Sequence, residues 1–375
     1  MTKEEASIIR LVNQQLSSPQ FENPEDVVDW MGMMQAQEYN YFRWAIAMRT
    51  KAPKIDALKE AFSLGRIVRL HLSRCTIHVV TPKDYKWISA LYRERNLQII
   101  KSLSVYNKAI FSKQYYLEGI AALKEVLVGS QGLSKVSIGE KFARLGLPSD
   151  KVHLNQVLLR GEIEGVVCSG IMTSKDATWA LTEERIKPLN EEHNVLTQPK
   201  ALELLAKKYF RSHSPASLED FCWWSNLSMG QARKAIEGIA TEIEEVRVED
   251  AKMYVWKKGL KRIEEEATNH CCLLPPYDEY LIGYKSRWVS INKRHEEKAH
   301  NNRGIFYPVV LFGGQVVGNW KATKVRDEQR IEIDLFSKKS TIGKRRIESA
   351  ITAWQDAQKT TSQHLNPLKK SNPIE

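Results

Sequence analysis

The chain has 375 residues, a length typical of two to three domains. Its hydrophobic fraction of 42% and charged fraction of 27% exclude a mainly disordered, collagen-like or small disulfide-stapled protein. Lys and Arg number 56 and Asp and Glu 45, so the formal net charge is +11. Such an excess favours a polyanionic partner through long-range attraction, and a basic cytosolic enzyme without one is the alternative.

The cysteines argue against a disulfide framework and against a zinc site. They form an odd set with no C-x-x-C pair: Cys75, Cys168, Cys222, Cys271 and Cys272. We expect the adjacent pair of cysteines to lie in or beside a strand as small hydrophobic residues. The histidines are scattered, and neither a Walker motif nor a dinucleotide-binding glycine pattern occurs. We therefore expect no metal and no cofactor.

Neither a targeting segment nor a membrane span is visible. The first residues, Met1 to Glu5, are polar and charged, unlike the apolar run of a signal peptide. No stretch approaches the roughly 18 uninterrupted apolar residues that a membrane helix requires. We expect a cytoplasmic protein, nucleoid-associated when bound to DNA.

The first segment predicts helices that are followed by two strands. Hydrophobic spacing places the helices near 4–17, 25–34 and 54–64. The strands are expected around Ile67 to Leu72 and Thr76 to Val80. Connecting helices complete this segment, which we assign to residues 1–114.

The same order recurs over residues 115–190. A first helix carries the apolar stripe from Tyr116 to Val128, and Ser137 with Glu140 looks like a capping box that opens a second helix. A third helix is expected over 150–164. Two short strands follow, over 166–169 and 179–182.

A third copy of this order is expected over residues 191–270. Its first helix carries Leu202, Leu205 and Tyr209, and its second follows Ser214-Pro215. Ser228 and Gln231 again form a capping box before a third helix. Strands over 243–248 and 253–256 then read as a hairpin.

The remaining chain is rich in strands. Strands are expected over 308–312, 316–321 and 331–336, and a helix over 341–360. The polar segment 363–375 reads as a flexible tail. The predicted fold is α+β, with three tandem winged-helix units followed by a β-rich, barrel-like domain over 271–362.

Two glutamines, Gln35 and Gln37, stand on either side of Ala36 near the end of the second predicted helix. One interpretation is that they are solvent-facing polar residues. The other is that both amides serve one ligand. Because residues i and i+2 diverge on a helix, the helix must then end near Met34 and the motif must be non-helical.

Several segments in succession resemble one family. They are Gln35-Ala36-Gln37, the run from Ser73 to Val80, the run from Leu273 to Tyr284, and Gly304 to Pro308 leading to Val317 to Lys321. In order and content they resemble the winged-helix DNA glycosylases of the AlkZ and YcaQ type. The family's catalytic signature is glutamine, an aliphatic residue and glutamine, and aspartate replaces the second glutamine in the YcaQ-like branch. The chain matches the first form, so the resemblance implies that Gln35 and Gln37 are catalytic. It further implies excision of alkylated purines, including crosslinked guanines. Cys75 and Pro276 depart from the family pattern, which usually has smaller residues there.

The chemistry of glutamine narrows the substrate. An amide does not titrate near neutral pH and is a poor general acid or base, but it can orient a water molecule. Such help is sufficient when the leaving group is already activated. A purine alkylated at N7 is cationic and needs no protonation, and the sugar it leaves becomes oxocarbenium-like. The motif therefore favours cationic lesions over normal bases.

Three carboxylates are other candidates for a role in the chemistry. Glu38 is the competing general base. Asp278 and Glu279, beside Tyr277, could build the catalytic rim or bind a metal, but we favour hydrogen bonds that pin a strand or turn.

Basic residues cluster in three places and are candidates for DNA contact. They are Arg66, Arg69, Arg74 and His78 around the first hairpin, Lys285 and Arg287, and Lys338, Lys339, Arg345 and Arg346. A solvated surface, or a core position for the histidine, is the alternative interpretation. Several phosphate contacts would make the affinity fall steeply with salt.

We predict a monofunctional DNA glycosylase that acts as a monomer on damaged double-stranded DNA. Water is favoured as the nucleophile because no motif places a lysine for Schiff-base chemistry. The alternative is a non-catalytic winged-helix DNA-binding protein, such as a transcriptional regulator.

Overall fold

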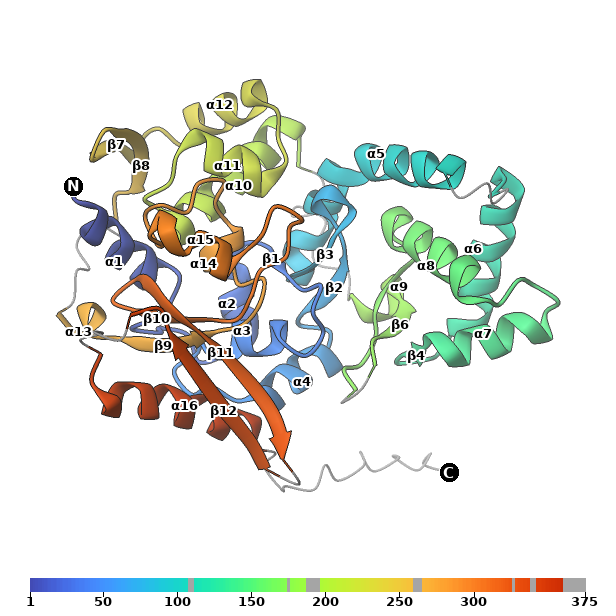
Figure 1. Ribbon diagram of the computed structural model, residues 1–375. Coiled ribbons are helices and arrows are strands. Elements are labelled where there is room, and N and C mark those ends of the chain that lie inside the picture. The colour runs from blue at the N-terminus through green and yellow to red at the C-terminus, as the bar shows by residue number, and fades with distance from the viewer. Residues whose placement is uncertain are drawn as a thin grey trace, which may run out of the picture.

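The computed structural model describes residues 1–106, 111–173, 176–186, 196–258, 265–325, 328–337 and 342–359 (Figure 1). The first segment contains the expected helices and strands in order, with one short helix and one short strand in addition. Its helices are α1 (Lys3–Asn13), α2 (Pro24–Met31), α3 (Phe42–Ala47), α4 (Ile55–Ser63) and α5 (Pro82–Tyr106). Its strands are β1 (Met34–Gln35), β2 (Val68–His71) and β3 (Ile77–Val80), with a 3-10 turn at Ser73–Cys75. The strands pair in the order β1-β3-β2, so the glutamine motif joins the edge of the predicted hairpin.

The second segment contains the three helices and two strands expected from the sequence. They are α6 (Lys113–Leu127), α7 (Lys135–Arg144), α8 (Lys151–Glu164), β5 (Val167–Ser169) and β6 (Thr178–Leu181), with the short β4 (Leu133–Ser134) and α9 (Thr182–Arg185) added. The predicted capping box is wrong by three residues. Helix α7 begins earlier because Ser134 caps it, and its hydroxyl accepts from the backbone N–H of Ser137.

The third segment repeats this order. Helices α10 (Gln198–His213), α11 (Leu218–Ser225) and α12 (Met229–Glu237) precede the hairpin of β7 (Ile243–Val248) and β8 (Ala251–Trp256). Here the predicted capping box is confirmed, since Ser228 and Gln231 cap α12 reciprocally. The core of this segment continues into β2 and α5, where Leu70 and Tyr92 join Tyr209 and Phe221 in one apolar cluster.

The C-terminal segment is an open antiparallel sheet, which corrects the expectation of a barrel. The strands β9 (Cys271–Leu274), β10 (Val309–Phe312), β11 (Gln315–Val325) and β12 (Glu328–Leu335) pair in the order β12-β11-β10-β9. Along β12, half-buried and exposed residues alternate from Ile331 to Leu335, the pattern of an edge strand that faces solvent. Cys271 and Cys272 lie in β9, as expected.

Helices cover this sheet and connect it to the N-terminus. They are α13 (Glu265–Thr268), α14 (Glu279–Ile282), α15 (Glu296–Ala299) and α16 (Lys344–Gln358), with a 3-10 turn at Lys293–His295. Leu11 and Trp44 share an apolar cluster with Leu273, Trp320 and Trp354, so the first and last segments are packed together.

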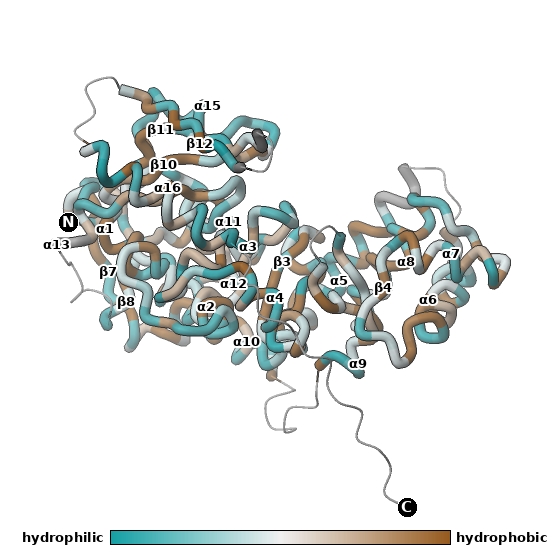
Figure 2. Tube along the Cα trace, turned by 90° about the horizontal axis from the view of Figure 1, so that it is seen from below, coloured by the Kyte–Doolittle hydropathy of each residue, from teal (hydrophilic) through white to brown (hydrophobic). Residues whose placement is uncertain are grey.

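Figures 1 and 2 show α6, α7 and α8 at one end of the molecule and the C-terminal sheet at the other, with β1 to β3 between them. The predicted flexible tail, 363–375, lies outside the described residues. None of the helices in the described ranges is long and apolar enough to cross a membrane.

Candidate active site

The glutamine motif is extended rather than helical. Helix α2 ends at Met31, and Gly32 turns the chain with a φ of +86°, where an added Cβ would lie 2.9 Å from the Cβ of Lys208. Gln35 then pairs with His78 of β3, and the N–H of Ala36 donates to the carbonyl of Ile77 at 2.8 Å. The motif therefore meets the condition that two amides at i and i+2 need in order to serve one ligand.

Both glutamines line one cavity of about 340 Å³. Segments that are far apart in the sequence build its walls, namely β1, the turn before β3, the end of α11, the start of α14 and the loop before β10. The cavity is lined by Gln35, Gln37, His71, Arg74, Cys75, Thr76, His78, Trp223, Trp224, Tyr277, Glu279, Ile282, Gly304 and Phe306.

In both glutamines, the side-chain amide oxygen accepts a hydrogen bond from a backbone N–H group, whereas the amide nitrogen has no partner in the described part of the chain. Oε1 of Gln35 accepts from the backbone N–H of Gln37 at 3.0 Å, and Oε1 of Gln37 accepts from the N–H of Ile77 at 3.4 Å. Neither Nε2 donates to any residue in the described part of the chain. Gln35 is half-buried and Gln37 is exposed. Both NH₂ groups are therefore available to a ligand.

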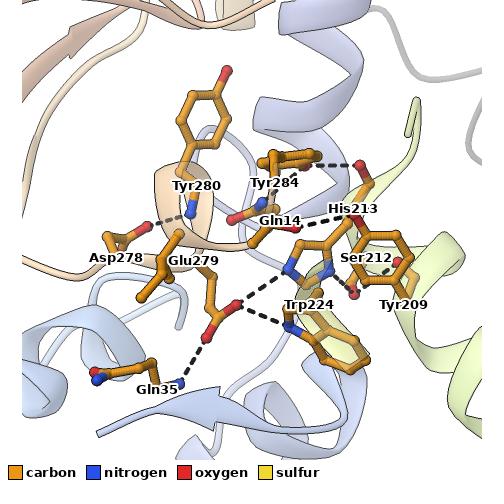
Figure 3. Close-up of polar contacts among 12 residues, drawn as sticks. Gln14, Gln35, Tyr209, Ser212, His213, Trp224, Asp278, Glu279, Tyr280 and Tyr284 are labelled. Carbon is orange, nitrogen blue, oxygen red and sulfur yellow. Dashed lines mark hydrogen bonds and ion pairs between the residues drawn. The ribbon is translucent and has the colours of Figure 1, made fainter. Parts of the chain in front are cut away.

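A buried carboxylate lies directly behind the motif (Figure 3). Glu279 is 3% exposed, and its Oε1 accepts from the backbone N–H of Gln35 at 2.6 Å. Its Oε2 accepts from Nε1 of Trp224 at 3.1 Å and faces Nε2 of His213 at 3.4 Å. Burial acts to raise the pKa of Glu279, but His213 and the Gln35 N–H lower it overall, so the carboxylate is ionised.

Asp278, the residue before Glu279, has a structural role. Asp278 caps α14 by accepting from the N–H of Tyr280, and it forms a buried bidentate pair with Arg49 at 2.7 and 2.9 Å. These contacts fix the start of α14, which carries Glu279. Tyr277 lies at the cavity rim with a φ of +60°. The predicted pinning of a turn is confirmed for Asp278.

Two histidines face the same cavity, and the sequence drew attention only to His78. That side chain is buried, its Nδ1 donates to the carbonyl of Thr76 at 2.9 Å, and burial lowers its pKa to about 4.

His71 instead directs Nδ1 to the carboxylate of Glu162 at 2.5 Å. Glu162 also accepts from the N–H of His71 at 2.9 Å and from Nε1 of Trp179 at 2.6 Å. Burial opposes ionisation of Glu162, but His71 and Trp179 lower its pKa.

Comparison with known proteins identifies the family. The sequence pattern of the family described as "DNA glycosylase AlkZ-like" matches residues 28–357. The chain belongs to the AlkZ-like DNA glycosylase family. A curated relative, the "Interstrand DNA cross-link repair glycosylase" of Streptomyces sahachiroi, is 23% identical over 343 residues, which cover 84% of this chain and 88% of the relative. The solved structure of Streptomyces sahachiroi DNA glycosylase AlkZ superimposes with a TM-score of 0.74 at 20% identity, covering 95% of this chain and 96% of that one.

Family membership makes this AlkZ-like protein a glycosylase enzyme, rather than the non-catalytic regulator considered as the alternative. The likeness to the solved structure shows a shared mixed α/β fold. The described residues contain no group of three or more His, Cys, Asp or Glu side chains that could hold a metal ion.

One departure from the family pattern, Cys75, lies in the turn before β3. Arg74 and Cys75 have φ values of +55° and +56°, in the left-handed region that favours glycine. The smaller residue of the family pattern suits this conformation, and here cysteine adopts it. The thiol is half-buried, and burial raises its pKa to about 11.

The basic residues of the first hairpin have different surroundings. Nε of Arg69 donates to the carbonyl of Ala36 at 3.0 Å, so this arginine supports the glutamine motif. Arg74 lines the cavity, donates to the carbonyl of Trp223 and lies 5.1 Å from the centre of that ring. Arg66 is exposed and forms ion pairs with Glu25 at 3.1 Å and Glu60 at 3.3 Å.

The other predicted DNA contacts are spread over the C-terminal segment. Lys285, Arg345 and Arg346 are exposed, whereas Arg287 is 8% exposed and donates to the carbonyls of Leu281 and Lys285. Arg287 therefore has a packing role. Lys338 and Lys339 lie outside the described residues.

Some residues that line the cavity were not predicted from the sequence, and one predicted candidate for the general base lies outside it. Glu38 is exposed and does not line the cavity. Trp223 was not singled out in the sequence, but it is 38% exposed and lines the cavity. His71 and Phe306 were also missed, because only tertiary packing brings them to the glutamines.

Proposed function

We propose that this protein hydrolyses the N-glycosidic bond of cationic alkylated purines in double-stranded DNA, using a water molecule positioned by Gln35 and Gln37. The observation that carries the proposal is the placement of both amides on one cavity with both NH₂ groups unbound. A backbone N–H holds each amide oxygen, so the two side chains are oriented before a substrate arrives.

The electrostatics of the cavity suit a cationic substrate of the N7-alkylguanine type. Departure of such a base neutralises its charge and transfers positive charge to the sugar. The ionised carboxylate of Glu279 lines the cavity and is shielded from bulk water. Because water screens it little there, this anion attracts a cationic transition state strongly. Glu279 thus holds the backbone of Gln35 and supplies negative charge.

We further propose that crosslinked guanines are among the substrates. The curated relative is named an interstrand cross-link repair glycosylase. A crosslinked base cannot be rotated into a closed pocket, so the catalytic groups must be reachable from the surface. The exposure of Gln37 and Gly304 at the cavity supports this access.

We propose that DNA lies along the cavity as the partner of a monomeric, cytoplasmic enzyme. The recurring order of helices and hairpin supports three winged-helix units, a common DNA-binding module. Arg74, Lys285, Arg345 and Arg346 would contact phosphates, since a basic chain gains affinity through such contacts.

The test is single-turnover release of 7-methylguanine from methylated duplex DNA. Gln35→Ala and Gln37→Ala should each lower the rate by about 10²–10³-fold, as removal of one preorganised donor does, while DNA affinity stays near that of the wild type. Gln114→Ala is the matched control, because this exposed glutamine of α6 bonds to Glu118 and does not line the cavity. Wild-type release by the double variant would remove both glutamines from the mechanism.

A further inference from the structure

Hydrolysis releases a proton, and the two amides orient the water without accepting that proton. When water attacks the anomeric carbon, it must lose a proton as the new C–O bond forms. An amide oxygen is too weak a base to take it. A basic group at the cavity that takes this proton would add general-base catalysis to the positioning of the water.

Three candidate bases are unsuitable in their surroundings. Glu279 accepts N–H groups on both of its oxygens, and its lowered pKa makes it a weak base. His78 is buried with a pKa of about 4. Glu38 is exposed and does not line the cavity.

The hydrogen bonding of His71 and its place at the cavity suit a general base. Its Nδ1 lies 2.5 Å from Oε2 of Glu162, a carboxylate whose residue is 4% exposed. To bond an ionised carboxylate, Nδ1 must carry a hydrogen, so Nε2 is the acceptor in the neutral form of the ring. Among the residues that the structure describes, Nε2 has no partner, and His71 lines the cavity with Gln35 and Gln37.

We propose that His71, oriented by Glu162, is the general base that takes the proton of the attacking water. Water adds to the anomeric carbon and its proton moves to Nε2, while the electrons of the C–N bond pass to the cationic purine, which leaves neutral. The imidazolium is stabilised by Glu162 and then releases its proton to solvent. This arrangement matches the carboxylate–histidine pairs of hydrolases, in which the carboxylate fixes the tautomer and stabilises the imidazolium. The inference rests on the proposed function and adds a residue to it.

The charged and titratable groups around His71 are compatible with this role. They are Glu162 on α8, His78 on β3, Arg74 and Cys75 in the turn, Arg69 on β2 and Glu279 across the cavity. His78 and Cys75 are neutral near pH 7, because burial lowers the pKa of the first to about 4 and raises that of the second to about 11.

The experiment compares single-turnover rates of 7-methylguanine release over a range of pH. His71→Gln should lower the rate by about 10²-fold or more, the usual contribution of general-base catalysis. The wild-type rate should fall as the pH is lowered and the base becomes protonated, and the variant should lose this dependence. Glu162→Gln should lower the rate at least tenfold. In His71→Ala, added imidazole should restore part of the rate, which it should not do in Gln35→Ala.

His153→Gln is the matched control, because His153 also directs Nδ1 to a carboxylate, that of Asp150, but does not line the cavity. A wild-type rate and pH profile in His71→Gln would overturn the proposal. A reduced rate with the wild-type pH profile and no rescue by imidazole would also overturn it, since a structural role alone gives that result. If the wild type releases no 7-methylguanine, it is the proposed function that fails.

Discussion

The carboxylate of Glu279 connects three segments of the chain, and Glu279→Gln tests how much this connection stabilises the fold. Glu279 belongs to α14, Gln35 to β1, and His213 and Trp224 to α10 and α11. The substitution keeps the size and shape of the side chain. It replaces one of two accepting oxygens with an NH₂ group that can only donate.

The expected cost follows from the donors around the carboxylate. If the amide oxygen faces Trp224 and His213, the NH₂ group meets the N–H of Gln35, which lies 2.6 Å from the carboxylate in the wild type. If the amide is turned round, the NH₂ group meets Nε1 of Trp224, which is 3.1 Å from Oε2 in the wild type. Either orientation leaves a buried donor unsatisfied, a loss of about 1–3 kcal/mol in the free energy of unfolding.

The measurement is urea unfolding of wild type and variant across pH. The folded-state pKa of Glu279 is lowered, so its contribution to stability is present above the unfolded-state pKa and is lost as the pH falls through the folded-state value. The difference between the two proteins should therefore be largest near neutral pH and shrink below about pH 4, where unfolded glutamates become protonated. A difference below about 0.5 kcal/mol at neutral pH would refute the reasoning, because the donors would then be satisfied without the charge.

Two further predictions concern a buried ion pair and the DNA contacts. Asp278→Ala leaves the buried guanidinium of Arg49 without its carboxylate and should lower the free energy of unfolding by about 3–5 kcal/mol, measured with urea. The double variant Arg49→Met with Asp278→Leu should lose much less, and equal losses would contradict this account. Alanine at Arg345 and Arg346 should make the plot of log affinity against log salt shallower by about 0.9 for each lost phosphate contact. An unchanged slope in DNA titrations would exclude both arginines from the interface.

Local sequence patterns predicted much of the secondary structure. Apolar spacing and turn residues depend on neighbours within a few positions, so helices and hairpins could be placed without knowing their partners. The capping box of Ser228 and Gln231 and the strand position of Cys271 are examples. The open sheet was not predictable in this way, because closure depends on whether β12 meets β9, and spacing along one strand does not decide that.

Helix α5 shows where periodicity fails. Its first half buries Tyr85, Ile88 and Tyr92 in the cluster shared with α10, and its second half buries Ile100 against Tyr116 of α6. Different faces are covered along its 25 residues, so no single apolar stripe develops.

The sequence by itself determined the glutamine pair, the recurring order of helices and hairpin, and the basic character of the chain, since these depend on residue type and short-range spacing. Tertiary structure alone decided what surrounds the pair. Glu279 reaches the backbone of Gln35 across 244 positions, and Glu162 reaches His71 across 91. Such contacts arise when separate helices and strands pack around one cavity, and no local pattern encodes them.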